Sequence, residues 1–180
     1  MKEFTFSKRN SFLILLTILL TGCGILLIQQ LAPKPAATDP APSPEQAAAE
    51  KAVVEGIEAF FQIQSDTGKE AWLSHFCSLS TVNGCALIEM GADRLWKKYA
   101  EAKTSVQATV KAVEQISSTT AEQVWKVEVT LSEPLPGSNK TQEEVYAVVV
   151  ETEGGWKFDR FLLEPEIQAL NDRQKKDGRP

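Results

Sequence analysis

The sequence predicts an α+β domain, with three helices followed by a four-stranded antiparallel sheet, behind an apolar N-terminal segment. Three observations predict this class. Apolar residues recur at helical spacing up to about residue 100. From Thr104 onward they alternate with polar residues at a spacing of two, as in strands with one buried face. All predicted helices precede all predicted strands, which is typical of α+β proteins and not of wound parallel sheets.

The composition limits the classes of function. The 180 residues are 43% hydrophobic and 24% charged, which suits one ordinary domain with additional segments. A net charge of −5 argues against a nucleic-acid partner, because such proteins bind phosphates with an excess of Lys and Arg. One histidine and three cysteines leave little material for a metal centre. The sequence therefore predicts no metal site, no cofactor and no nucleic-acid binding.

The N-terminal segment has the length and composition of a membrane span. The 21 residues 12–32 carry no charge, and a helix of that length rises about 32 Å, enough to cross the hydrocarbon core. Lys8 and Arg9 precede it, which the positive-inside rule keeps in the cytoplasm. We therefore expect a single-pass protein of the cell membrane that contacts lipid through residues 12–32. The rest of the chain is then outside the cytoplasm.

A second interpretation of the same segment stays open. Leu20-Thr21-Gly22-Cys23 resembles the lipobox of bacterial lipoprotein precursors, in which the chain is cut before the cysteine and the cysteine is diacylated. The apolar run continues through residues 25–28, whereas lipoproteins usually turn polar at this point. The uncleaved span is the expectation, and lipidation at Cys23 is the alternative. Both tether the same domain on the same side.

The chain is expected to have four parts. Residues 1–32 form a cytoplasmic tip and the anchor. Residues 33–44 contain five prolines and three alanines, a composition typical of an extended spacer that reaches roughly 35 Å. Residues 45–170 form the α+β domain. Residues 171–180 are polar and are expected to be a disordered tail.

Capping signals place the predicted helices. The first begins at Ser43, with Pro44 in the first turn and Gln46 completing a capping box, and it extends to about residue 63. A second capping box, Thr67 with Glu70, starts the next helix. The residues 83–84, Asn-Gly, are a turn signal before a third helix. The apolar stripe of the third helix contains Leu87, Ile88, Gly91, Leu95, Trp96 and Tyr99.

Four strands follow. The first alternates over residues 105–112, and Val113 breaks the alternation, which predicts a β-bulge. Residues 125–131 alternate most regularly, with Lys126, Glu128 and Thr130 on a second face that could meet a neighbour. The continuous apolar run 145–150 predicts a central strand covered on both faces. The residues 154–155, Gly-Gly, predict a tight hairpin into the last strand, 156–163.

Residues 45–164 resemble the cone-shaped fold of nuclear transport factor two and its relatives, also called cystatin-like. The resemblance lies in the order of the elements and in the closing turn Gly154-Gly155-Trp156-Lys157-Phe158. It implies that the sheet is curved around the helices. This fold hosts enzymes, receptors and scaffolds, so it does not by itself imply a function.

The anchor, stalk and domain together are similar to the inner-membrane scaffold proteins of type IV secretion and conjugation machines. That resemblance implies a non-enzymatic assembly module that associates weakly with itself and docks other envelope or channel proteins. No motif in this sequence carries over a functional residue. The alternatives are a stalked lipoprotein, a domain that binds a small ligand, or an enzyme that uses the cone pocket.

Two sets of residues are candidates for chemistry. Cys77 and Cys85 lie eight positions apart, and outside the cytoplasm they are the natural pair for a disulfide, with two buried free thiols as the alternative. Enzymes with this fold often place a His and an Asp inside the cone. His75 with Asp93 or Asp159 is the only such combination here, and a surface histidine is the plainer interpretation. We predict no catalytic residue.

Overall fold

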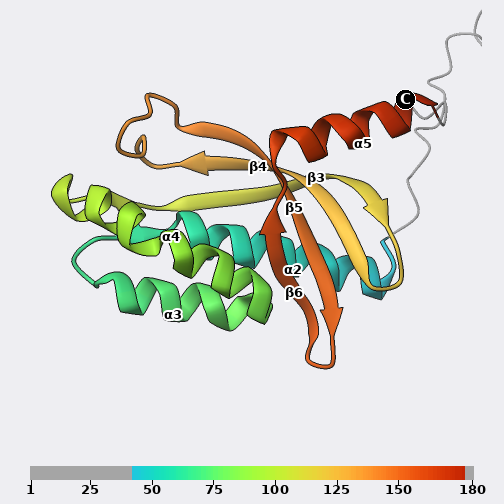
Figure 1. Cartoon of the computed structure of the whole chain (residues 1–180), viewed down its shortest axis with the longest axis horizontal. Coiled ribbons are helices and arrows are strands. Elements are labelled where there is room, and N and C mark those ends of the chain that lie inside the picture. The colour runs from blue at the N-terminus through green and yellow to red at the C-terminus, as the bar shows by residue number, and fades with distance from the viewer. Residues whose placement is uncertain (1–41, 177–180) are drawn as a thin grey trace, which may run out of the picture. The chain divides into compact units, whose positions relative to one another are not determined.

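The computed structural model describes residues 42–176, which form helices α2 to α5 and strands β1 to β6 (Figure 1). The predicted anchor, Cys23, most of the predicted stalk and residues 177–180 lie outside the described residues. Within residues 42–176, no helix is both long enough and apolar enough to cross a membrane.

Helix α2 (Pro44–Phe61) begins where its capping signal predicts. The Ser43 Oγ accepts a hydrogen bond from the Gln46 backbone N–H at 3.1 Å, and proline occupies the first turn. Ala49, Val53 and Ile57 form its fully buried face. The helix ends about two residues before the predicted boundary. The next residues form strand β1 (Ile63–Gln64), which pairs with β2 (Ser105–Val106).

Helices α3 (Lys69–Leu79) and α4 (Val82–Glu101) start at residues other than those predicted. The capping box at Thr67 is wrong, because the Thr67 hydroxyl donates to the Gln64 carbonyl at 2.8 Å and Gly68, with φ +89°, is the N-cap. The turn at residues 83–84 is also wrong. Thr81 caps α4 by accepting from the Gly84 N–H at 2.9 Å, so both residues of the supposed turn are helical.

The main sheet is an antiparallel meander in the order β3-β4-β5-β6. Its strands are β3 (Ala108–Ser118), β4 (Glu122–Leu131), β5 (Gln142–Thr152) and β6 (Gly155–Phe161). The pairing of β3 with β4 shifts register between Ala112 and Glu114, which confirms the predicted bulge. β5 lies between two strands, as its apolar run predicts. The hairpin into β6 closes with Thr152 opposite Gly155, whose φ is +95°.

Helices α2, α3 and α4 lie on the same side of the sheet (Figure 1). This inner side holds the core, in which Ile57, Phe76 and Phe158 are fully buried. Five phenylalanines pack there mostly edge to face, with ring centroids 5.0–6.2 Å apart: Phe60, Phe61, Phe76, Phe158 and Phe161. The predicted α+β class is confirmed, and aromatic side chains fill the space between the helices and the sheet.

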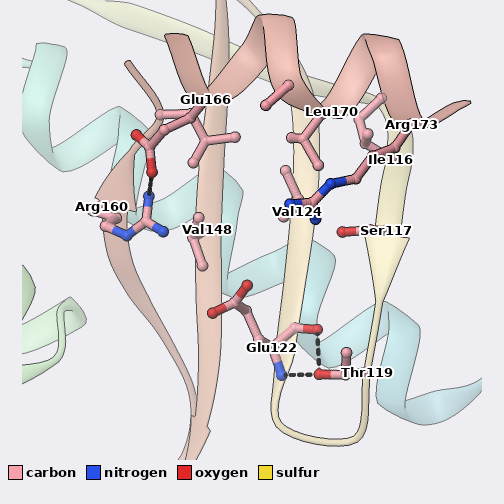
Figure 2. A pocket seen from close by; sticks show the side chains of 12 residues that line it. Ile116, Ser117, Thr119, Glu122, Val124, Val148, Arg160, Glu166, Leu170 and Arg173 are labelled. Atoms are coloured by element: carbon pink, nitrogen blue, oxygen red, sulfur yellow. Dashed lines mark hydrogen bonds and ion pairs between the residues drawn. The ribbon is translucent and has the colours of Figure 1, made fainter. Parts of the chain in front are cut away.

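Helix α5 (Glu164–Lys176) corrects the predicted tail. Residues 171–176, predicted to be disordered, are its last two turns. The Glu166 carboxylate accepts from the Leu163 N–H at 2.8 Å at the start of the helix. Acidic residues occupy its first turn and basic residues its last, which favours the helix through its dipole. α5 lies across the outer side of the sheet (Figures 1 and 2).

Candidate functional site

The three residues predicted for a catalytic pocket have separate surroundings. His75 is exposed on α3, and Asp93 is exposed on α4. Asp159 lies on β6 and is largely buried. No hydrogen bond or ion pair joins any two of the three among the described residues, and none of the cavities considered below is lined by His75 or Asp93. The structure does not bring these side chains together.

Asp93 holds a lysine at the surface. The Lys69 Nζ lies 2.6 Å from the Asp93 Oδ1, and this hydrogen bond is the main cause that raises the pKa of Lys69 above its ordinary value. Because the pair is exposed to solvent, its effect on stability is small. The contact joins the start of α3 to the middle of α4.

Asp159 fixes the start of α4 against the edge strand β6. Its Oδ1 accepts a hydrogen bond from the Thr81 hydroxyl at 2.6 Å, and Thr81 in turn caps α4. The Thr81 N–H also donates to the Phe158 carbonyl at 2.7 Å. A Cβ atom at Gly84 would lie 2.2 Å from the Asp159 carbonyl oxygen, so the backbones of α4 and β6 are in direct contact here. These bonds give Asp159 a structural role.

A disulfide joins Cys77, near the end of α3, to Cys85, in the first turn of α4. It closes a short loop over the same region in which Thr81 and Asp159 meet. The α3–α4 connection is thus held covalently as well as by hydrogen bonds.

Four large apolar side chains are exposed on α4 and just before α5. The exposed fractions are 90% for Val82, 42% for Leu87, 80% for Met90 and 68% for Leu163. We call these four residues, together with the groove that Leu87 and Leu163 line, the α4 surface. The groove has a volume of about 420 Å³ and is lined mainly by carbon atoms of α4, β6 and α5, among them Ile88 and Phe161.

The α4 surface combines protruding and recessed apolar parts. Gly91, next to Met90, has open space in front of it, since a Cβ atom there would meet nothing within 4 Å. Monomeric soluble proteins rarely expose contiguous apolar patches larger than about a few hundred Å². Exposed apolar surface of this kind is typical of a contact with another protein.

A second groove lies between α5 and the outer face of the sheet (Figure 2). We call it the α5 groove. Its volume is about 560 Å³. Its apolar lining is aliphatic, with no aromatic ring, and comes from β3, β4, β5, α5 and the segment that joins β6 to α5: Ile116, Val124, Val148, Leu162, Ala169 and Leu170.

Charged side chains border the α5 groove. Arg160 is paired, with its Nη1 3.0 Å from the Glu166 Oε1 and its Nε 3.8 Å from the Asp159 Oδ2. Arg173 reaches from the last turns of α5 toward Val124 and Ser117 (Figure 2). No ion pair joins Arg173 to any other described residue. The Arg173 guanidinium thus lies at one end of an aliphatic groove without an ion-pair partner among residues 42–176.

The rest of the outer face is polar. Val124 and Lys126 share this face of β4 with Glu128 and Thr130, because strand side chains alternate between faces. The Lys126 Nζ lies 2.8 Å from the Glu144 Oε2, and this bond is the largest cause that raises the pKa of Lys126. The polar residues predicted to meet a neighbour are thus exposed or half-buried, and Lys126 is already paired within the sheet.

Sequence reasoning did not find the α4 surface or the α5 groove. A signal for the first was present, because Val82 and Met90 are apolar residues that fall outside the helical stripe of residues 87–99. For the α5 groove the signal was weak, since the polar residues 171–180 predict a disordered tail and not the end of a helix. In residues 42–176 no group of three His, Cys, Asp or Glu side chains could hold a metal ion.

No family model and no curated protein sequence matches this chain. Solved structures of similar shape include the Agrobacterium tumefaciens VirB8 protein, with 12% identity and a TM-score of 0.46 over 68% of this chain and 94% of that one. A periplasmic fragment of TraM has 13% identity and a TM-score of 0.44 over 65% and 95% of the two chains. A domain of unknown function with a cystatin-like fold, from Nostoc punctiforme, has 13% identity and a TM-score of 0.43 over 72% and 86%.

The identities and TM-scores are low, so we transfer no residue role, partner or activity from these chains.

Proposed function

We propose that this chain is a non-enzymatic assembly module that is tethered to the membrane and acts outside the cytoplasm in a type IV secretion or conjugation complex. The α4 surface is the observation that carries the proposal. Val82 and Met90 project apolar side chains from α4, and Leu87 and Leu163 line an apolar groove. Covering such a surface with a partner is favourable, because it removes apolar side chains from water.

The first partner is a second copy of the chain. In a two-fold symmetric dimer the same patch meets itself, so a patch needs both projecting and recessed parts to be self-complementary. The α4 surface has both, in Met90 and the groove lined by Ile88 and Phe161. Other envelope proteins dock on the assembled module.

The energies favour weak association in solution. Fully burying one such side chain contributes about 1.5–3 kcal/mol, and four of them per copy are available. The loss of translational and rotational freedom costs about 4–15 kcal/mol, which is of the same order. Tethering by residues 12–32 raises the effective concentration of the copies, so association is expected in the membrane and not in dilute solution.

The interior of the domain supports a non-enzymatic role. Phe76 and Phe158 fill the space between helices and sheet, and their rings stand 5.5 Å apart. His75 is exposed on α3 and is not part of this core. An enzyme that used the cone would need a cavity with His75 and a carboxylate directed into it, and no such cavity is among those described above.

Site-specific photo-cross-linking in native membranes tests the proposed function. A photoreactive amino acid is placed in the full-length chain at position 90 or 82, on the α4 surface. Matched exposed positions are 130, on the outer face of the sheet, and 138, in the β4–β5 loop. The proposal predicts cross-linked dimers from 90 and 82 and only monomer from 138. Dimers from 130 alone would move the interface to the sheet and overturn the assignment to α4.

A further inference from the structure

The α5 groove has the features of a ligand site. It shares only Arg160 and Glu166 with the groove of the α4 surface. Its volume, about 560 Å³, falls within the range of roughly 300–1,000 Å³ that is typical of small-molecule sites. Val124 and Val148 stand opposite each other on β4 and β5 and form its floor. Leu170 of α5 forms part of its roof (Figure 2).

The lining selects a class of ligand. Its apolar side chains are aliphatic, so a flat aromatic ligand would find no ring on which to stack, whereas a flexible hydrocarbon chain fits between branched side chains. One end carries the Arg173 guanidinium beside the Ser117 hydroxyl, and these are donors that suit a carboxylate or a phosphate.

The two carboxylates that line the groove, those of Glu166 and Glu122, do not neutralise Arg173. Glu166 is occupied by Arg160 and by the Leu163 N–H. The Glu122 carboxylate is directed toward the side of Val148 and not toward Arg173 (Figure 2). The guanidinium of Arg173 is therefore the part of the groove best placed to receive an anion.

We propose that the α5 groove binds a single-chain amphiphile with an anionic headgroup, with its hydrocarbon chain between α5 and the sheet and its headgroup on Arg173. A fatty carboxylate and an anionic lysophospholipid share this chemistry. The site does not depend on the proposed assembly role, because it involves none of Val82, Leu87, Met90 and Leu163.

Photoaffinity labelling of the full-length chain in phosphatidylcholine nanodiscs tests the proposal. The probe is dodecanoate that carries a diazirine in its chain, and labelled residues are identified by peptide sequencing. Competitors are dodecanoate, lauroyl lysophosphatidylglycerol, dodecanol and dodecylamine. Arg173→Gln removes the headgroup partner, and Lys175→Gln is its matched control on the same helix. Ala169→Trp fills the groove from the exposed helix, and Gln168→Trp is its matched control.

The expected label lies on β4, β5 and α5 peptides of the groove. An anionic competitor should displace the probe better than dodecanol or dodecylamine, and the better of the two anions identifies the source of the headgroup. Arg173→Gln should weaken labelling about threefold to tenfold, and Ala169→Trp should abolish it. The proposal is overturned if the label is spread over the surface, if dodecanol competes equally, or if each variant behaves like its control.

Discussion

At the scale of single residues, the contact between α4 and β6 depends on the absence of a side chain at Gly84. A methyl group there would meet the Asp159 carbonyl oxygen at 2.2 Å, and a backbone atom cannot turn aside as a side chain can. We expect Gly84→Ala to lower the free energy of unfolding by about 1–3 kcal/mol, measured by urea unfolding with tryptophan fluorescence.

Gly91 is the matched control for this substitution, since it lies in the same helix and has open space at its Cβ. Gly91→Ala should raise stability by up to about 1 kcal/mol, because alanine has the higher helix propensity. Equal effects of the two substitutions would show that α4 and β6 do not touch at Gly84.

Burial of Tyr99 makes the stability of the domain fall at alkaline pH. Burial raises the pKa of this phenol above its ordinary value of 10.0, because the ionised form loses solvation inside the protein. The folded state therefore retains a proton that the unfolded chain releases as the pH rises above about 10. The protonated Tyr99 phenol therefore favours the folded state below that pH, and this stabilisation is lost above it.

We expect Tyr99→Phe to lose less stability than the unsubstituted chain between neutral pH and about pH 11. Unfolding midpoints measured at a series of pH values check this. Parallel curves for the two proteins above pH 10 would contradict the assigned burial of the phenol.

At the scale of elements, the disulfide between α3 and α4 is open to direct test. Protein taken from its native compartment should show no reactive thiol at Cys77 or Cys85 when it is denatured without reduction. The double variant Cys77→Ser, Cys85→Ser should be less stable by about 2–3 kcal/mol, because the closed loop is short. Two free thiols at these positions would rule out the bond.

Several elements could be predicted because their signals are local. The cap at Ser43, the bulge at Val113 and the alternation along β4 depend on neighbours in sequence, and the structure agrees with each. The start of α4 could not be predicted in this way. Thr81 caps it while bonded to Asp159, which lies 78 positions away in sequence.

The end of α5 could not be predicted from its neighbours in sequence either. Its last six residues are polar and have few apolar neighbours in sequence, which predicts disorder. The helix forms against a sheet face whose apolar residues, Val124 and Val148, lie on other strands. For the same reason the groove beneath α5 could not be predicted, since its lining comes from five separate segments of the chain.

At the scale of the whole molecule, the form of the tether distinguishes the two interpretations of the N-terminal segment. We predict that residues 12–28 remain in the mature protein as a single span, because the apolar run continues beyond Cys23. Mass spectrometry of the intact, membrane-extracted chain decides this. A chain that begins with diacylated Cys23 and lacks residues 1–22 would establish the lipoprotein alternative instead.

The central claim is that copies of this protein assemble in the membrane through the α4 surface. The most direct measurement is the number of copies per complex after mild chemical cross-linking in native membranes. It compares the unsubstituted chain with Leu87→Glu, and circular dichroism verifies that the variant is folded. We predict dimers for the unsubstituted chain and monomer for the variant, because a buried unpaired carboxylate opposes association. Monomer alone from the unsubstituted chain, together with turnover of a small molecule that requires His75, would contradict the account.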